Sequence, residues 1–387
     1  MTCHNKVALR TRHPHLVKVF VENHKYMSLN LLNAHQQWAS RPADQRFDSL
    51  DSLFDSVSGR RLRSRSSDIT LKSIEAKSDN GMITLNHGIK EVEPSHWSFG
   101  QLAGWIKAPA EYLRRLPIDL ATKNINHGIQ SADIGDLKFM TVISPDGTTK
   151  NTLQAVTSTK YGRIWDADVV NSAKRIVERS NGKFYNPKAY DIATGKPTAS
   201  GLYASDRDVF IFMIDGGSLL DVGPRAQLNR GFFMWNSETG SRTFGVTTFL
   251  FNVVCGNHIV WGAQDVKELR IRHTQNGPYR FDSEAMPELL AYVNASPKAE
   301  IDAIKKAQDY LLPSIEKDEI IGWMQARKFT RNEAMETFDF AVKEEGECRT
   351  LWNVVQGATA YARGFDFVDA RVEMETKAGK LMDIVKV

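Results

Sequence analysis

The chain has 387 residues, of which 42% are hydrophobic and 25% are charged. These values match the average of globular proteins and exclude a disordered chain, a collagen-like chain and a polytopic membrane protein. Fifty Lys and Arg against 46 Asp and Glu leave a net charge of +4, which permits nucleic-acid binding without requiring it. The length suits two domains, or one large domain with a helical appendage.

The cysteine pattern and the apolar segments indicate a reducing compartment. Cys3, Cys255 and Cys348 form no CxxC pair, so neither a disulfide framework nor a cysteine zinc site is expected. No apolar segment of signal-peptide length follows the basic residues of positions 1–12. The most apolar stretch, 244–263, is interrupted by polar residues and is interpreted as a buried strand and a turn. We therefore expect a cytoplasmic protein with no membrane partner.

The first 70 residues differ from the rest in charge, with eleven Lys and Arg against six Asp and Glu. Within them, 56–67 reads SVSGRRLRSRSS, rich in Ser and Arg and poor in apolar residues. This composition predicts a flexible basic loop or linker. Two interpretations stay open: an arm whose Arg60, Arg61, Arg63 and Arg65 contact phosphates, or a solvated linker.

Strands and short helices alternate over the next hundred residues. Strands are predicted at 82–85, 137–144 and 153–158. Ser98 followed by Gln101 matches a capping box ahead of a helix. A second helix is expected over 109–116, ended by Pro117, and a third over 166–179, capped by Asp166.

The middle of the chain is rich in strands. The run 208–215 (DVFIFMID) is mostly apolar and predicts a buried central strand. Two further strands, 231–235 and 244–254, are joined by hairpin chemistry at 236–241. The segment 266–273 alternates, so Leu269 and Ile271 should face the core while Arg270 and Arg272 face outward.

From position 282 onward the pattern becomes helical. Helices are predicted over 282–293, 297–312, 314–327, 330–345 and 350–362, with Thr330 and Glu333 as a second capping box. The fold class is therefore α+β, with a mixed, largely antiparallel β-rich central region and a helical C-terminal third. The expected division is a basic, partly flexible segment at 1–90, an α+β core domain at 91–281 and a helical region at 282–387.

Established catalytic signatures are absent: no Gly-rich phosphate loop, no GxSxG and no HExxH occurs. The histidines around His13-Pro14-His15 could hold a metal only with ligands from elsewhere, and an exposed segment is favoured. Cys255 and His258 are interpreted as a buried thiol and a turn residue in preference to a nucleophile–base pair. Asp206 and Asp208 share one face of a strand and could bind Mg²⁺, although they also suit an ordinary strand entry.

Basic and aromatic residues interleave in the β-rich middle, with Phe232, Phe233 and Trp235 among the arginines. Cations beside aromatic rings on a sheet are what single-stranded DNA requires, because phosphates need charge and unstacked bases need flat partners. The competing interpretation, favoured for Phe232 and Trp235, is core aromatics with solvated arginines outside.

Several ordered segments look familiar together: Tyr112–Pro117, Thr157–Ser158 with Tyr161–Trp165, Arg230–Phe233, Trp235–Glu238, Val254–Gly262, Leu351–Val355 and Ala358–Ala362. In this combination they resemble the phage- and plasmid-associated family known as domain of unknown function 932. They span roughly residues 95–365. The resemblance implies mobile-element DNA metabolism in a bacterial host, and it supplies no catalytic residues.

The leading hypothesis is a phage or mobile-element protein that binds single-stranded DNA in replication or recombination. It would act in the bacterial cytosol as a homo-oligomer, with no cofactor, no metal and no catalytic residue. The expected DNA contacts are Arg60, Arg61, Arg63, Arg65, Arg163, Arg225, Arg230, Arg242, Lys267, Arg270 and Arg272.

Two alternatives stay open. The first is a metal-dependent nuclease or other hydrolase, with candidate groups Asp206, Asp208, Glu238, Cys255 and His258. The second is a non-catalytic factor that binds a phage or host protein through the helical third.

Overall fold

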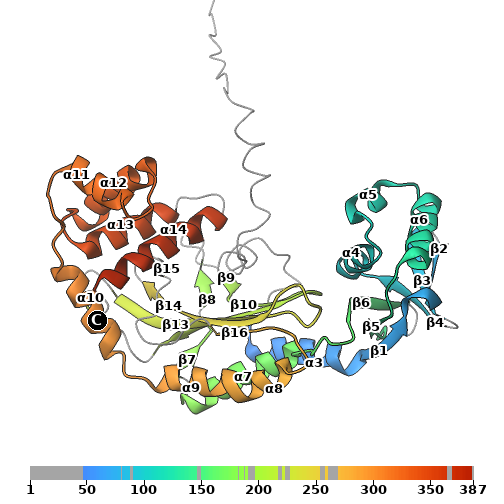
Figure 1. Cartoon of the computed structure of the whole chain (residues 1–387). Coiled ribbons are helices and arrows are strands. Elements are labelled where there is room, and N and C mark those ends of the chain that lie inside the picture. Colours follow the sequence, from blue (N-terminus) through green and yellow to red (C-terminus); the bar gives the residue numbers. More distant parts are fainter. Residues whose placement is uncertain are drawn as a thin grey trace, which may run out of the picture.

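The computed structural model describes residues 47–385 apart from gaps at 80, 88–89, 146–149, 182, 187, 191–196, 217–219, 223–226, 253–257, 260–268 and 364–367. Three parts follow one another across the molecule: a first lobe, a central sheet and a group of C-terminal helices (Figure 1). The α+β class is confirmed, including the largely antiparallel middle and the helical C-terminal third. Within the described residues, no helix combines the length and the apolarity needed to cross a membrane.

The first lobe is a six-stranded sheet covered by three helices. Its strands are β1 (Ser64–Thr70), β2 (Glu75–Asp79), β3 (Met82–His87), β4 (Lys90–Pro94), β5 (Asp136–Val142) and β6 (Asn151–Ser158), in the order β1-β5-β6-β4-β3-β2. Only the pair β4–β6 is parallel. Helices α4 (His96–Trp105), α5 (Ala110–Arg115) and α6 (Ile118–Ser131) contribute Leu102, Leu113, Ile125 and Ile129 to its core. The sheet joins strands from both sides of residue 90, where composition placed a boundary.

The predicted flexible loop at 56–67 is wrong. Residues Leu50–Arg63 form helix α3, and β1 follows at Ser64. Ser49 caps α3 in a capping box with Ser52, and Leu53 and Val57, one turn apart, are fully buried. The Ser- and Arg-rich composition hid this apolar spacing, and burial of one stripe is enough to order the helix.

The central sheet is built on three long strands, β11 (Val209–Asp215), β13 (Gln227–Asn236) and β14 (Phe244–Asn252), all antiparallel. Short strands extend it: β7 (Phe184–Tyr185), β10 (Leu202–Ala204), β12 (Leu220–Asp221), β15 (His258–Ile259) and β16 (Leu269–Ile271). A separate pair is formed by β8 (Lys188–Tyr190) and β9 (Pro197–Ser200).

The two faces of this sheet bury different side chains, as strand alternation requires. One face packs Ile211, Met213 and Met234 against α3, α7 (Asp166–Arg179) and α9 (Met286–Asn294), which lie beneath the sheet (Figure 1). The other face gathers a cluster of mostly aromatic side chains, Tyr203, Phe210, Phe212, Ile214, Phe233, Trp235 and Phe249. The buried run predicted at 208–215 is therefore confirmed as a strand that is buried on both faces.

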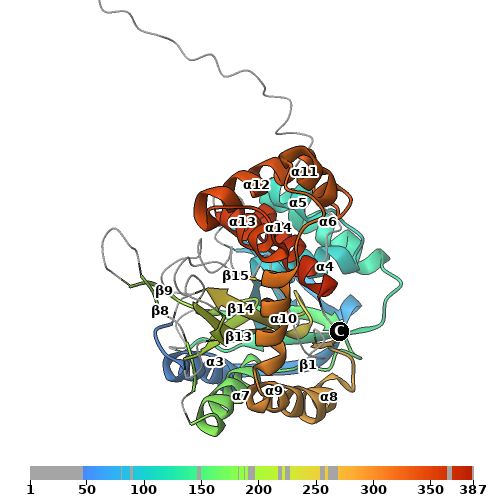
Figure 2. The same ribbon diagram turned by 90° about the vertical axis from the view of Figure 1, so that its left-hand side faces the viewer.

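The chain leaves the sheet through α8 (Gly277–Arg280), a π-helical turn at Phe281–Ala285, and α9. Helix α10 (Lys298–Asp309) then crosses one end of the sheet, between α9 and the remaining helices (Figure 2). Those helices are α11 (Lys317–Gln325), α12 (Arg331–Glu345), α13 (Leu351–Arg363) and α14 (Val368–Leu381). The predicted capping box of Thr330 and Glu333 is confirmed at the start of α12.

Candidate functional site

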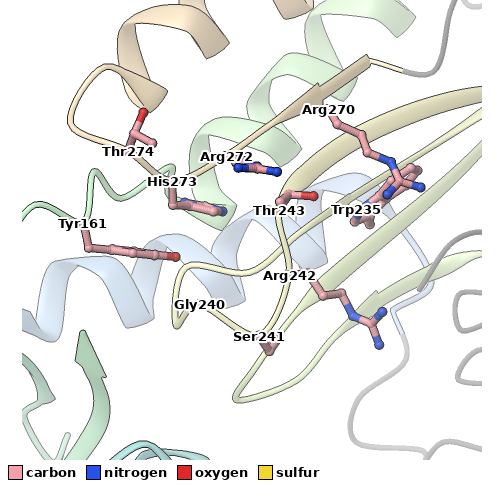
Figure 3. Close-up of a pocket in the computed structure, with 10 residues that line it drawn as sticks. All are labelled: Tyr161, Trp235, Gly240, Ser241, Arg242, Thr243, Arg270, Arg272, His273 and Thr274. Atoms are coloured by element: carbon pink, nitrogen blue, oxygen red, sulfur yellow. The ribbon is translucent and has the colours of Figure 1, made fainter. Parts of the chain in front are cut away.

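A cleft of about 430 Å³ opens beside β16, at the edge of the central sheet (Figure 3). Its walls come from three places: the loop after β6, the loop that joins β13 to β14, and β16 with the residues that follow it. The lining residues are Tyr161, Trp235, Gly240, Ser241, Arg242, Thr243, Arg270, Arg272, His273 and Thr274. Three arginines, three Ser or Thr hydroxyls and three rings thus surround one hollow.

Arg270 of β16 and Arg272, the residue that follows the strand, both line the cleft. Ile271 is fully buried in the core, whereas Arg270 and Arg272 are exposed on the opposite side, as the alternation predicted. The guanidinium carbon of Arg270 lies 5.9 Å from the ring centroid of Trp235, which is a cation–π distance (Figure 3). No ion pair of Arg272 is found within the described part of the chain.

Trp235 reaches Arg270 because the residue between them is a glycine. Trp235, Gly245 and Arg270 face one another across β13, β14 and β16. A Cβ on Gly245 would lie 2.0 Å from Cζ2 of Trp235. The indole therefore lies flat over the backbone of β14, at 3% exposure, and supports the guanidinium from below.

A stack of two rings forms the other side of the cleft. Tyr161 and His273 are parallel, with centroids 5.0 Å apart and planes at 7°. The backbone N–H of Ile164 donates to Nδ1 of His273 at 3.3 Å, and the hydroxyl of Tyr161 donates to the carbonyl of Ser237 at 3.1 Å. Burial lowers the pKa of His273 to about 4, so the ring is neutral at pH 7. The two stacked rings are therefore uncharged, and the guanidinium carbon of Arg163 lies 5.3 Å from the ring centroid of Tyr161.

Beneath the cleft lies a buried ionic network centred on Arg60 of α3. Its Nε donates to Oε1 of Glu238 and its Nη2 to Oδ2 of Asp166, both at 2.7 Å, and its Nη1 donates to the carbonyl of Ser205. Asn236 donates to the other oxygen of Asp166 at 2.7 Å. Both carboxylates are almost wholly buried, and burial raises the pKa of Asp166 well above its usual range.

The first lobe also contacts the β13–β14 loop. The carbonyl of Thr239 accepts from Nε1 of Trp97 at 3.2 Å and from Nε2 of Gln101 at 2.9 Å. The predicted capping role of Ser98 and Gln101 is wrong, because α4 begins at His96 with Ser95 as its cap. Gln101 instead connects the loop to β6, where its Oε1 accepts from the N–H of Val156 at 2.9 Å.

Most of the arginines expected to contact DNA already bind acceptor groups of the protein itself. Arg230 pairs with Glu300 at 3.2 Å, and both side chains are buried. Arg242 lines the cleft but pairs with Asp208 at 3.1 Å.

Arg61 and Arg163 also have partners within the chain. Arg61 pairs with Asp168 at the surface at 2.5 Å, and Arg163 donates to the carbonyl of Glu238. The structure thus brings Arg242, Arg270 and Arg272 together at one cleft and places the buried Arg60 and Arg230 in separate parts of the interior.

Arg63 and Arg65, two further predicted contacts, do not line the cleft. Arg63 closes α3, and Arg65 on β1 donates to the carbonyls of Leu62 and Ser64. Arg225 and Lys267 lie outside the described residues.

The aromatic residues are core residues, as favoured for Phe232 and Trp235. Phe232 packs against the helices under the sheet, and Phe233 belongs to the aromatic cluster on the opposite face. The Tyr161–His273 stack was missed, because the two residues are far apart in sequence and only the fold makes them neighbours.

The acidic residues considered for hydrolysis are divided among separate ion pairs. Asp206 lies near Arg207, while Asp208 and Glu238 are held by Arg242 and Arg60. Within the described ranges, no three His, Cys, Asp or Glu side chains come together in a way that could hold a metal ion. Cys255 lies outside those ranges, and only the backbone of His258 is described.

Comparison with known proteins gives one finding. A family model described as domain of unknown function (DUF932) matches residues 154–377, which include the central sheet and most of the C-terminal helices. No curated protein matches the chain, and no solved structure does.

Proposed function

The chain belongs to the DUF932 family, a domain of unknown function, and we propose that this protein binds single-stranded DNA at the cleft beside β16 without catalysing a reaction on it. The observation that carries the proposal is the pair of exposed guanidinium groups of Arg270 and Arg272, at a hollow that also holds stacked rings and hydroxyls.

The cations suit a phosphate backbone. Side chains two residues apart on a strand lie on one face, roughly 7 Å from each other. Arg270 and Arg272 can therefore serve two phosphates of one strand, and the hydroxyls of Ser241, Thr243 and Thr274 add hydrogen-bond donors beside them. Because Trp235 supports Arg270 from below, the guanidinium is held in position before any ligand arrives.

The rings favour a single strand over a duplex. A hollow of about 430 Å³ accepts an unstacked base but no double helix. The neutral rings of Tyr161 and His273 line this hollow, and a neutral ring can stack on any base. Binding should therefore depend little on sequence and strongly on salt.

The biological setting is part of the same proposal. The sequence resemblance to phage- and plasmid-associated proteins supports a role in replication or recombination of a mobile element. The bacterial cytosol and a homo-oligomeric state stay predictions.

Fluorescence anisotropy with a labelled oligothymidylate tests the proposal. The double variant Arg270→Ala/Arg272→Ala should weaken binding and lower the slope of log affinity against log salt by about 1.4, the value for two lost phosphate contacts on a single strand. The matched control is Arg115→Ala/Arg175→Ala, which removes two exposed charges from α5 and α7. It should bind like the wild type. Absence of wild-type binding to any single strand at low salt would refute the proposal.

A further inference from the structure

The loop between β13 and β14 has two roles in the structure. Residues Gly240–Thr243 form one wall of the cleft. The residues just before them, Ser237–Thr239, are buried, and Glu238 among them is hydrogen-bonded to Arg60. Any group that fixes the buried half of this short loop therefore also fixes the wall.

Arg60 is the group that holds Glu238, although the two residues are 178 positions apart in sequence. The three donor atoms Nε, Nη1 and Nη2 each have an acceptor: Glu238, Ser205 and Asp166. The Arg60 side chain is 16% exposed, and its two carboxylate partners are at most 1% exposed. A guanidinium used in this way is not available to a phosphate.

The arrangement depends on the shape of arginine and not on its charge alone. The backbone N–H of Asp166 donates to Oε2 of Glu238 at 3.1 Å, so the two acidic residues are held close together. Without a planar fork between them, two buried carboxylates would repel each other. A lysine supplies the same charge from one nitrogen and cannot reproduce three divergent hydrogen bonds.

We propose that Arg60 is a positioning residue for the cleft: it holds Glu238 and thereby sets the place of the wall Gly240–Thr243 relative to Arg270 and Arg272. Its effect on ligand affinity rests on the proposed DNA binding. The effect of Arg60 on the loop is independent of DNA binding and can be measured on the protein without a ligand.

The direct measurement is hydrogen exchange of the amides in residues 237–243, followed by mass spectrometry on the full chain. Arg60→Lys should speed exchange there by about tenfold or more, because loss of the fork lets the loop open. The matched control is Arg61→Lys on the same helix, whose surface pair with Asp168 is 41% exposed on both sides. It should exchange like the wild type. Unchanged exchange in Arg60→Lys would overturn the inference.

The affinity measurement separates geometry from charge. Arg60→Lys should lose about tenfold in affinity for oligothymidylate, a usual size for coupling between a site and its support. Arg272→Lys should lose less, because a phosphate contact survives as a point charge. If the wild type binds and Arg60→Lys binds equally well, the inference fails. If the wild type does not bind, the proposed function fails, and the exchange measurement alone decides the role of Arg60.

A milder variant covers the case in which Arg60→Lys unfolds. In Glu238→Gln the amide oxygen can still accept from Arg60, but the amide nitrogen cannot accept from the N–H of Asp166. This isosteric change should also speed exchange in 237–243 while thermal unfolding stays cooperative. A loop that exchanges like the wild type in Glu238→Gln would contradict the inference.

Discussion

Gly357 of α13 lies against the backbone of Thr337 on α12: a Cβ at position 357 would be 2.3 Å from the Thr337 carbonyl oxygen and 2.7 Å from the Cβ of Ala341. The two helices therefore meet backbone to backbone at this point. Thr337 and Ala341 are fully buried there, and no side chain is available that could turn away to make room.

Gly357→Ala should be destabilising although alanine favours helices. The clash with backbone forces the helices apart, at a cost of about 1–3 kcal/mol in the free energy of unfolding. The matched control is Gly322→Ala in α11, where a new Cβ meets nothing within 4 Å. It should stabilise by roughly 0.5–1 kcal/mol. Urea unfolding of both variants checks the opposite signs; equal effects would contradict the close helix contact.

Gly245→Ala should displace the indole of Trp235 and with it the guanidinium of Arg270. We expect a loss of about 1–3 kcal/mol in the free energy of unfolding, because the ring has no other space at 3% exposure. DNA affinity should fall in the same variant, since Arg270 loses the surface beneath it. Gly104→Ala in α4, where a Cβ meets nothing within 4 Å, is the control for both measurements.

Arg230 and Glu300 are predicted to act on stability and not on DNA binding. Arg230→Met leaves Glu300 as a buried unpaired charge, which should cost about 3–5 kcal/mol. The double variant Arg230→Met/Glu300→Leu should regain much of this loss. It should not regain all of it, because Arg230 also donates to the carbonyls of Tyr292 and Ala295 at the end of α9.

Urea unfolding of the single and double variants measures that coupling. The salt dependence of DNA binding should match the wild type in the double variant. A lowered salt slope would instead indicate that Arg230 contacts phosphate.

The His273 ring should make stability depend on pH. Burial lowers its pKa to about 4 in the folded chain, against 6.5 for an unperturbed histidine. Between these values the unfolded chain binds a proton that the folded chain does not. The free energy of unfolding therefore falls as pH falls from 6.5 towards 4.

The variant His273→Phe keeps a ring on Tyr161 and removes this titration. When the pH is lowered from about 7 to about 5, the wild type should lose about 2 kcal/mol of unfolding free energy that the variant does not lose. Urea unfolding at both pH values measures the change. A constant difference between the two proteins would show that His273 does not titrate as its burial requires.

Local sequence patterns predicted a strand or helix well where one buried face or one capping residue is enough to determine it. The apolar run at 208–215, the alternation around Ile271 and the cap at Thr330 all needed only a few neighbouring residues. Helix α6 was missed although Ala121, Ile125 and Ile129 have helical spacing, because polar residues fill the positions between them.

The site was less predictable, for a physical reason. A guanidinium can bind either a phosphate or a carboxylate. The sequence around Arg60 or Arg230 does not show which of the two it binds. Their partners, Glu238 and Glu300, become neighbours only after the sheet and helices have packed. Arg270 and Arg272 were placed correctly on the outer face because strand alternation alone determines it.

Helix α3 lies before the first lobe in sequence, yet it packs into the core beneath the central sheet. The family match begins only at residue 154. A fragment that begins at that point would lose Leu53 and Val57 from the core. It would also leave the carboxylates of Asp166 and Glu238 without Arg60, their ion-pair partner. The packed core thus extends beyond the segment that the family model matches, and a shortened protein for experiments needs to retain α3.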